Sequence, residues 1–182
     1  MSNREALREL QTRLAQRLQA ARTESRRASW LAVEVAGVGL LFPLAGAGEI
    51  FSVPPLLSMP HTQPWFAGVA NLRGGLHGVV DLGAFLGLRA AVPEATREHG
   101  RLVALNPLLG SHCALLVDRL AGLRGAEQLQ PHLPTHSSAQ SGVLPARPAF
   151  ALSAWVDAEG RFWQEIDLGA LAANEQFLGI AA

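Results

Sequence analysis

Histidine, cysteine and acidic residues are the side chains of this chain whose spacing could support catalysis or metal binding. His132 and His136 stand four residues apart, which suits a metal only on a helix, and neighbouring prolines predict a loop there instead. His112 and Cys113 are adjacent in an apolar run, and adjacent strand residues point to opposite faces, so they predict no catalytic pair. We therefore expect a buried, inert Cys113 and no catalytic, metal-binding or cofactor-binding residues.

Common catalytic and nucleotide-binding motifs are missing from the sequence. It contains no Gly-x-Ser-x-Gly elbow and no Gly-x-Gly-x-x-Gly fingerprint. It also contains no lysine, which excludes a phosphate-binding-loop lysine or a Schiff base. Its single cysteine excludes an internal disulfide and a cysteine-ligated metal cluster. We expect that the protein is not an enzyme.

The composition predicts a folded chain that does not enter a membrane. Apolar residues make up 49% of the 182 residues and charged residues 16%, against about a quarter in ordinary domains. Disorder is thereby excluded, and electrostatic binding of nucleic acid is disfavoured. The longest apolar window, Val35 to Gly48, has fourteen residues, whereas a spanning helix needs about 20. We expect a cytoplasmic protein with no direct membrane insertion.

Charge divides the chain near residue 29. Residues 1–29 carry seven arginines and three acids, a net +4, and the remainder balances this with −4. Leu7, Leu10, Leu14 and Leu18 recur at steps of three and four, which predicts an amphipathic, arginine-rich helix over 1–29. Its narrow apolar stripe could pack on its own domain, pair with a partner helix or lie on an anionic membrane.

After residue 29 the pattern is that of short strands separated by turns. Asp81 and Asp167 each end a predicted strand and precede a short helical piece, so we expect them to cap those helices. We expect a short helical piece at 45–50, an extended proline-rich connection at 52–64, a linker at 89–100 and an irregular loop at 128–148. The predicted hairpins are 30–35 with 38–42, 68–72 with 76–80, 101–105 with 112–117, and 150–156 with 162–166.

Individual residues of the second hairpin have conformational interpretations. Gly74 and Gly75 are expected to supply positive φ angles at the turn. Gly68 is expected to allow a close approach of backbone, from a neighbouring strand or from a partner. Leu76 is expected in the core. Trp65 and Phe66 follow the proline-rich connection and are expected to be exposed as contact residues.

The run Gly68-Val-Ala-Asn-Leu-Arg-Gly74, followed by Val79-Val-Asp-Leu82 and Phe85-Leu-Gly87, resembles the signature of the CheW-like family. Glu49-Ile50, the strand ending at Asp118 and the closing Ile166-Asp-Leu168 fit the same family in order. The arginine-rich N-terminal segment, Pro64-Trp65 and the tail Glu175-Gln-Phe-Leu178 resemble its PilI-type subgroup, which serves type IV pilus twitching motility.

The resemblance implies a mainly β fold of two small five-stranded β-barrel subdomains with a groove between them. The domain would span 30–175, with a first barrel at about 36–90 and a second at about 100–172. It implies a cytoplasmic, non-enzymatic adaptor, without cofactor, that joins the signalling tip of a chemoreceptor to the regulatory domain of a CheA-type histidine kinase in membrane-associated arrays.

The same resemblance points to residues that contact partners. Glu49 and the arginine of the Asn-x-Arg-Gly turn, Arg73, are expected to form a pair beside the groove. An adaptor of a flagellar or other chemosensory array, and a β-barrel ligand-binding module, remain as alternatives; a net acidic body disfavours a nucleic-acid ligand. The expected partner-binding residues are Glu49, Gly68, Arg73, Gly74, Trp65 and Phe66.

Overall fold

A computed structural model of the chain describes residues 28–91, 99–132, 144 and 148–182. The predicted N-terminal helix lies almost wholly outside these residues, as does most of the predicted linker at 89–100. The elements are β1 (Ala28–Val35), β2 (Val38–Pro43), β3 (Ala47–Ser52), β4 (Phe66–Leu72), β5 (Gly75–Asp81), α2 (Leu82–Phe85), β6 (Arg101–Leu105), η1 (Pro107–Leu109), β7 (Cys113–Val117), β8 (Arg119–Gly125), η2 (Ala126–Gln128), β9 (Leu129–His132), β10 (Ala151–Asp157), β11 (Phe162–Ile166), α4 (Leu168–Ala172) and α5 (Glu175–Leu178).

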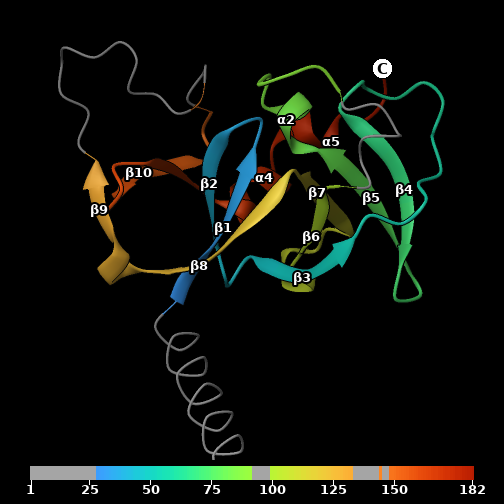
Figure 1. The fold of residues 1–182 in the computed structure, drawn as a ribbon. Coiled ribbons are helices and arrows are strands. Elements are labelled where there is room, and N and C mark those ends of the chain that lie inside the picture. Colours follow the sequence, from blue (N-terminus) through green and yellow to red (C-terminus); the bar gives the residue numbers. More distant parts are fainter. Residues whose placement is uncertain (1–27, 92–98, 133–143, 145–147) are drawn as a thin grey trace, which may run out of the picture.

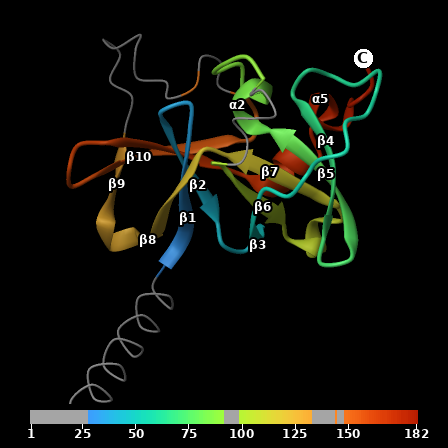
Figure 2. The same cartoon turned by 45° about the vertical axis from the view of Figure 1, so that its right-hand side comes forward.

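The strands form two sheets that lie side by side (Figures 1 and 2), and α4 contributes Leu168 and Leu171 to the core between them. One sheet has six strands in the order β8-β1-β2-β11-β10-β9, and the other has five in the order β3-β6-β7-β5-β4. All four predicted hairpins are present as antiparallel pairs. The mainly β fold is confirmed, whereas closure of either sheet into a barrel stays a prediction.

Each sheet contains a hairpin from the other half of the chain. The β1–β2 hairpin lies between β8 and β11, and β2 runs parallel to β11. Conversely, the β6–β7 hairpin lies between β3 and β5, and β7 runs parallel to β5. The sheets therefore do not divide the chain into the predicted segments of about 36–90 and about 100–172. Local patterns locate hairpins but do not say which sheet receives each of them.

The exchanged strands are buried on both faces. In β6, Val103 and Leu105 face the core between the sheets, while Leu102 and Ala104 face a smaller core of the five-stranded sheet. In β1, alternate residues likewise contribute to the central core and to a smaller core of the six-stranded sheet. Near-continuous apolar runs are what strands covered on both faces require. Fully buried side chains of the central core include Val33, Leu40, Phe42, Leu82, Leu115, Ile166 and Leu171.

The two halves repeat one strand–cap–helix unit. Asp81 follows β5, and its side chain accepts hydrogen bonds from the backbone N–H groups of Gly83 and Ala84. Asp167 follows β11 and accepts in the same way from Gly169 and Ala170. Both predicted caps are confirmed. A carboxylate at this position satisfies backbone donors at the start of each helix that would otherwise lack partners.

An ion network joins the β1–β2 hairpin to the five-stranded sheet. Arg89 donates to Asp81 at 2.8 Å and to Asp118 at 3.0 Å. The other oxygen of Asp118 accepts the backbone N–H of Ala36, in the β1–β2 turn, at 2.6 Å. The Asp81 side chain is only 1% exposed, so its pairing with Arg89 avoids an uncompensated buried charge. One arginine thus connects elements from both halves.

Two local predictions are wrong. Residues 47–52 form β3 rather than part of a helical piece at 45–50, because they pair with β6, which lies far along the chain. The predicted irregular loop at 128–148 contains β9 at its start, paired with β10. In both cases a partner distant in sequence decides the conformation of a segment whose local pattern is weak.

The exchange of hairpins predicts that neither half folds alone. A fragment of residues 1–95 lacks the strands that flank β1–β2, and a fragment of 96–182 lacks those that flank β6–β7. We expect each fragment to be unfolded by circular dichroism and amide chemical-shift dispersion, and an equimolar mixture to regain the spectrum of the intact chain. Cooperative folding of either fragment by itself would contradict this topology.

Candidate functional site

Glu49 and Arg73 form an ion pair at the surface of the five-stranded sheet. An Arg73 nitrogen lies 2.6 Å from a carboxylate oxygen of Glu49. Glu49 lies on β3, at one end of the strand order, and Arg73 lies in the turn between β4 and β5, at the other end. The side chains are 43% and 75% exposed. The predicted pair is therefore present, but such an exposed pair contributes only about 0–1 kcal/mol to stability.

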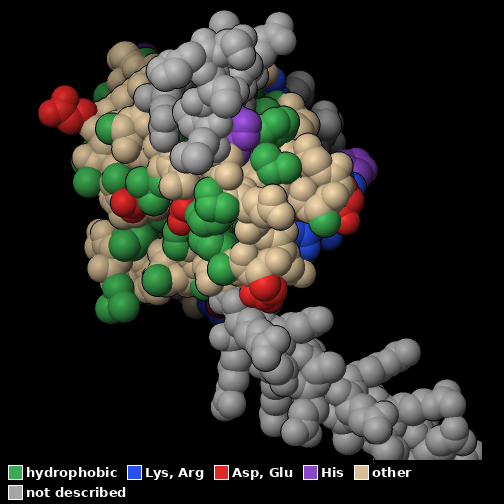
Figure 3. Space-filling model, turned by 90° about the vertical axis from the view of Figure 1, so that its left-hand side faces the viewer, with side chains coloured by type: hydrophobic (Ala, Val, Ile, Leu, Met, Phe, Trp, Pro, Cys, Tyr) green, Lys and Arg blue, Asp and Glu red, His purple; other side chains and the backbone are tan. Residues whose placement is uncertain are grey.

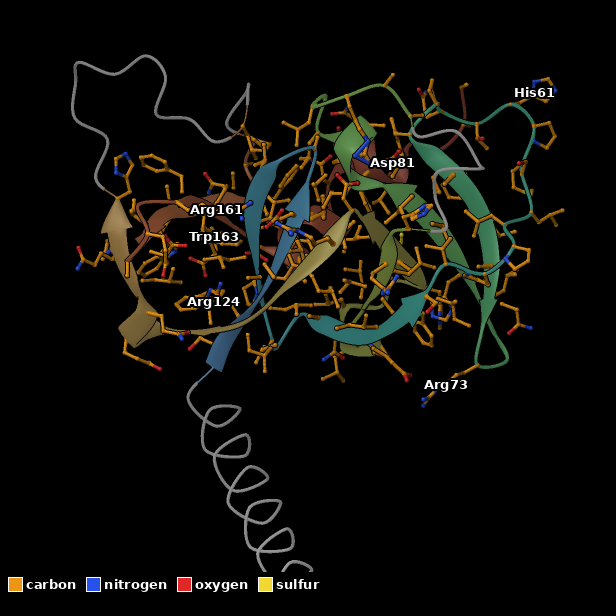
Figure 4. The ribbon with its side chains drawn as sticks, in the orientation of Figure 1. His61, Arg73, Asp81, Arg124, Arg161 and Trp163 are labelled. Carbon is orange, nitrogen blue, oxygen red and sulfur yellow. The ribbon has the colours of Figure 1, made fainter. Side chains whose placement is uncertain are left out.

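The turn that carries Arg73 has the geometry of a tight hairpin. Leu72 pairs with Gly75, which leaves Arg73 and Gly74 as the two loop residues. Their φ angles are 49° and 84°, as a type I′ turn requires. The Asn71 side chain accepts the Gly74 N–H at 2.8 Å. The positive φ angles thus belong to Arg73 and Gly74, not to the predicted Gly74 and Gly75, and Arg73 extends from the tip of the hairpin (Figure 4).

Exposed apolar side chains adjoin both members of the pair in sequence. Ile50, next to Glu49, is 39% exposed, and Leu76, just beyond the turn, is 68% exposed. Leu76 was predicted in the core, and that prediction is wrong. Its place at the start of a short strand, next to a two-residue turn, is the sequence feature that could have indicated this exposure. Charged and apolar groups together at a surface are typical of protein–protein contacts.

Gly68 serves the packing of the chain on itself. Its φ angle is 127°, and a Cβ atom there would lie 2.4 Å from the Leu57 carbonyl oxygen. Leu57 and Val69 exchange two backbone hydrogen bonds, each of 2.9 Å. The sequence left open whether Gly68 admits a neighbouring strand or a partner. The geometry shows the close approach of a neighbouring segment of this chain.

Trp65 and Phe66 differ from their predicted exposure. Trp65 is only 7% exposed and contacts the rings of Phe85 and Phe177, with centroids 5.1 Å and 6.5 Å away. Phe66 is half-buried and packs against Gly78. Trp65 is buried because residues from the C-terminal end of the chain cover it, which the preceding proline-rich segment does not reveal.

The six-stranded sheet holds a second charged cluster, around Glu34. Glu34 is largely buried and accepts hydrogen bonds from Arg119 and Arg161. The hydrogen bond from Arg161 is the main reason that the pKa of Glu34 lies below its ordinary value of 4.5; burial acts in the opposite direction, and Arg119 lowers the pKa further. The local sequence around Glu34 gave no sign of these partners, which lie 85 and 127 residues away.

Trp163, on β11, links this cluster to Asp157 at the end of β10. The guanidinium carbon of Arg161 lies 4.6 Å and that of Arg124 5.6 Å from the ring centroid (Figure 4), within range of cation–π attraction. The indole N–H donates to Asp157 at 2.8 Å. Burial raises the pKa of Asp157, but hydrogen bonds from Trp163 and from the backbone of Arg161 and Glu159 outweigh it and lower the pKa.

The residues with catalytic potential do not assemble into a centre in the described part of the chain. Cys113 is buried, and burial raises the pKa of its thiol to about 12, so the nucleophilic thiolate is not available at neutral pH. His112 is exposed beside it. His136 lies outside the described residues. Over 28–91, 99–132, 144 and 148–182, no group of three His, Cys, Asp or Glu residues could hold a metal ion.

A second side of the molecule, formed by the six-stranded sheet, also carries exposed apolar side chains. Hydrophobic groups are spread over it with scattered acidic groups between them (Figure 3). Among the helices of the described residues, none has the length and apolar composition to cross a membrane. The large exposed residues of this sheet are Leu123, Leu152 and Phe162, each 41–43% exposed.

Comparisons with known proteins agree with the motif. The model of the CheW-like domain family matches residues 29–176. Protein PilI of Pseudomonas aeruginosa is 28% identical over 174 residues, covering 93% of this chain and 89% of that protein. A probable chemotaxis protein CheW of Rhizobium etli is 43% identical over 47 residues, covering 26% of this chain and 30% of that protein.

A solved structure shares the fold. The crystal structure of the scaffolding protein TtCheW from Thermoanaerobacter tengcongensis superposes with a TM-score of 0.56 at 17% sequence identity, covering 78% of this chain and 89% of that one. At this identity the likeness concerns the arrangement of the strands. The resemblance inferred from the residues 68–87 is confirmed.

The Glu34 cluster predicts a specific dependence of stability on pH. Folding lowers the pKa of Glu34. The Glu34 charge therefore contributes fully to the free energy of unfolding above the unfolded pKa, and this contribution is lost as pH falls through the folded pKa. We expect Glu34→Gln to lower the free energy of unfolding by about 2 kcal/mol at neutral pH, the scale of hydrogen bonds to a charged group. The difference from wild type should shrink below about pH 4.

Urea unfolding of both proteins at a series of pH values measures this difference. Glu159→Gln is the control, because Glu159 is exposed in the turn between β10 and β11 of the same sheet and its substitution should leave stability nearly unchanged. A difference between wild type and Glu34→Gln that stays constant across the acid range would show that the charge of Glu34 is not what matters.

Proposed function

Because this chain belongs to the CheW-like domain family, we propose that it is a non-enzymatic adaptor that couples a methyl-accepting chemoreceptor to a CheA-type histidine kinase. We place it in the chemosensory system of type IV pilus twitching motility, at membrane-associated arrays in the cytoplasm. The similarity to Protein PilI, which extends over 93% of this chain, supports this system over a flagellar or other chemosensory array.

The surface around Glu49 and Arg73 is the observation that carries the proposal. It combines an exposed ion pair with exposed Ile50 on β3 and exposed Leu76 on the β4–β5 hairpin. A partner that covers this surface buries apolar area and shields the ion pair from water. Apolar burial contributes about 25 cal/mol per Å² to binding before the costs of association, so the leucine and isoleucine supply affinity and the charges supply orientation.

An adaptor needs a second contact on another face. The exposed Leu123, Leu152 and Phe162 of the six-stranded sheet offer one, away from the Glu49–Arg73 hairpin (Figure 1). The extensive core between the two sheets joins the surfaces into one body. In our proposal, a change in the receptor alters the kinase only through the free energies of these two contacts, since a scaffold couples partners by differential binding.

Reversal of charge at Arg73 tests the site. We expect Arg73→Glu to weaken binding to the receptor tip or to the kinase regulatory domain at least about tenfold, a change of about 1.4 kcal/mol. The exposed pair contributes little to folding, so the melting temperature should change by no more than about 2 °C. Titration calorimetry with each purified partner measures the affinity, and circular dichroism measures the melting temperature.

Arg101→Glu is the matched control, because Arg101 is an exposed arginine in the same sheet. We expect its affinity to stay within about twofold of wild type, since a solvent-exposed charge outside a contact contributes little. Binding of Arg73→Glu at wild-type affinity to both partners would remove Arg73 from the contact surface.

A further inference from the structure

The last nine residues cross from one sheet to the other. We name Asn174–Ala182 the C-terminal strap; it follows α4, its helix α5 lies beside α2, and its last residues pair with residues 61–63, ahead of β4 (Figures 1 and 2). The Gln63 N–H donates to the Ile180 carbonyl at 2.8 Å, and the Gln63 side-chain amide donates to Ala181 at 3.0 Å. The Ala182 N–H donates to the His61 carbonyl at 3.1 Å.

The strap therefore holds the second half, 61–65, of residues 53–65, which we name the connecting segment. This segment runs from the end of β3 to the start of β4 without forming a strand or helix, and it contains four prolines. Loops of this length are uncommon unless they are functional or held by other contacts. Val53 and Leu56 of this segment pack against the smaller core of the five-stranded sheet, and Leu57 pairs with Val69. The strap contacts hold the segment at its exposed tip near His61 (Figure 4).

Phe177 is the apolar anchor of the strap. Its side chain is 3% exposed, and its ring centroid lies 6.5 Å from that of Trp65 in a stacked arrangement and 5.3 Å from that of Phe85, edge to face. Trp65 is the residue before β4, and its carbonyl accepts the Asp81 N–H at 2.8 Å. Phe177 thus packs against the point where the connecting segment becomes β4. Its neighbour Leu178, in the same short helix, is 60% exposed.

We propose that Phe177 is a positioning residue for the partner-binding surface, acting through the connecting segment. The inference rests on the proposed function of the Glu49–Arg73 surface. Glu49 and Arg73 belong to elements at opposite ends of the strand order, and the connecting segment is the stretch of chain that joins those elements directly. The paired strands β3-β6-β7-β5-β4 set the separation of these elements, and an exposed pair worth about 0–1 kcal/mol adds little to it. The docked strap adds a second constraint, because it holds the stretch of chain that joins them directly.

The first test compares three variants of the full chain. We expect Phe177→Ala to stay folded at 20 °C and to weaken partner binding about tenfold, because a loosened connecting segment must be ordered again on binding. Leu178→Ala removes an exposed side chain from the same helix and should bind within about twofold of wild type. Leu129→Ala removes a buried side chain from the smaller core of the six-stranded sheet and controls for lost stability alone.

The second test restores the position of the strap without the phenyl ring. Thr62 and Ala181 are an antiparallel bridged pair, whose Cα separation of about 4.5–5.5 Å suits a disulfide. We expect the oxidised Thr62→Cys/Ala181→Cys pair to return the affinity of Phe177→Ala to within about threefold of wild type, and reduction to abolish this rescue. Cys113 does not interfere, because its thiol is buried.

Three results would overturn the proposal. Wild-type affinity in folded Phe177→Ala would show that the strap does not affect the surface. Equal weakening by Leu129→Ala would show that lost stability explains the effect. Failure of the formed disulfide to restore binding would show that strap position is not what Phe177 supplies. Failure of wild type to bind either partner would instead refute the proposed function itself, and the positioning role with it.

Discussion

The exchange of two hairpins between the sheets is the constraint on which the rest of the structure depends. Because β1–β2 and β6–β7 each lie inside the sheet of the other half, these strands are covered on both faces, and their side chains alternate between the central core and a smaller core. Neither sheet is complete without strands from the other half of the chain. The chain thus forms one body in which surfaces on different sheets keep a fixed relation, as the proposed adaptor role requires.

Local sequence patterns predicted the hairpins and the two aspartate caps, because strand alternation, turn residues and capping depend on neighbours in sequence. They did not predict β3, the burial of Trp65 or the partners of Glu34. Each of these depends on a contact with a residue far along the chain: β6 for β3, Phe177 for Trp65, and Arg161 for Glu34. The family resemblance supplied Glu49 and Arg73, whereas exposed Leu76 became visible only in the fold.

The ion pair of the candidate surface is weak, whereas the strands and the turn that carry it are firmly held. The Glu49–Arg73 pair is exposed and contributes little to folding, while the turn beneath it is fixed by two positive φ angles and by the Asn71 side chain. Charges in such a place are free to respond to a partner, and their position is set by the strands that carry them and, in our proposal, by the connecting segment and the strap.

Co-sedimentation of the full chain with a receptor signalling tip and the CheA-type kinase of the pilus system tests the central claim most directly. The account predicts that the chain pellets with both partners together, and that omitting it removes the kinase from the receptor pellet. A folded chain that joins neither partner, or kinase that pellets with receptor equally well without it, would contradict the adaptor role.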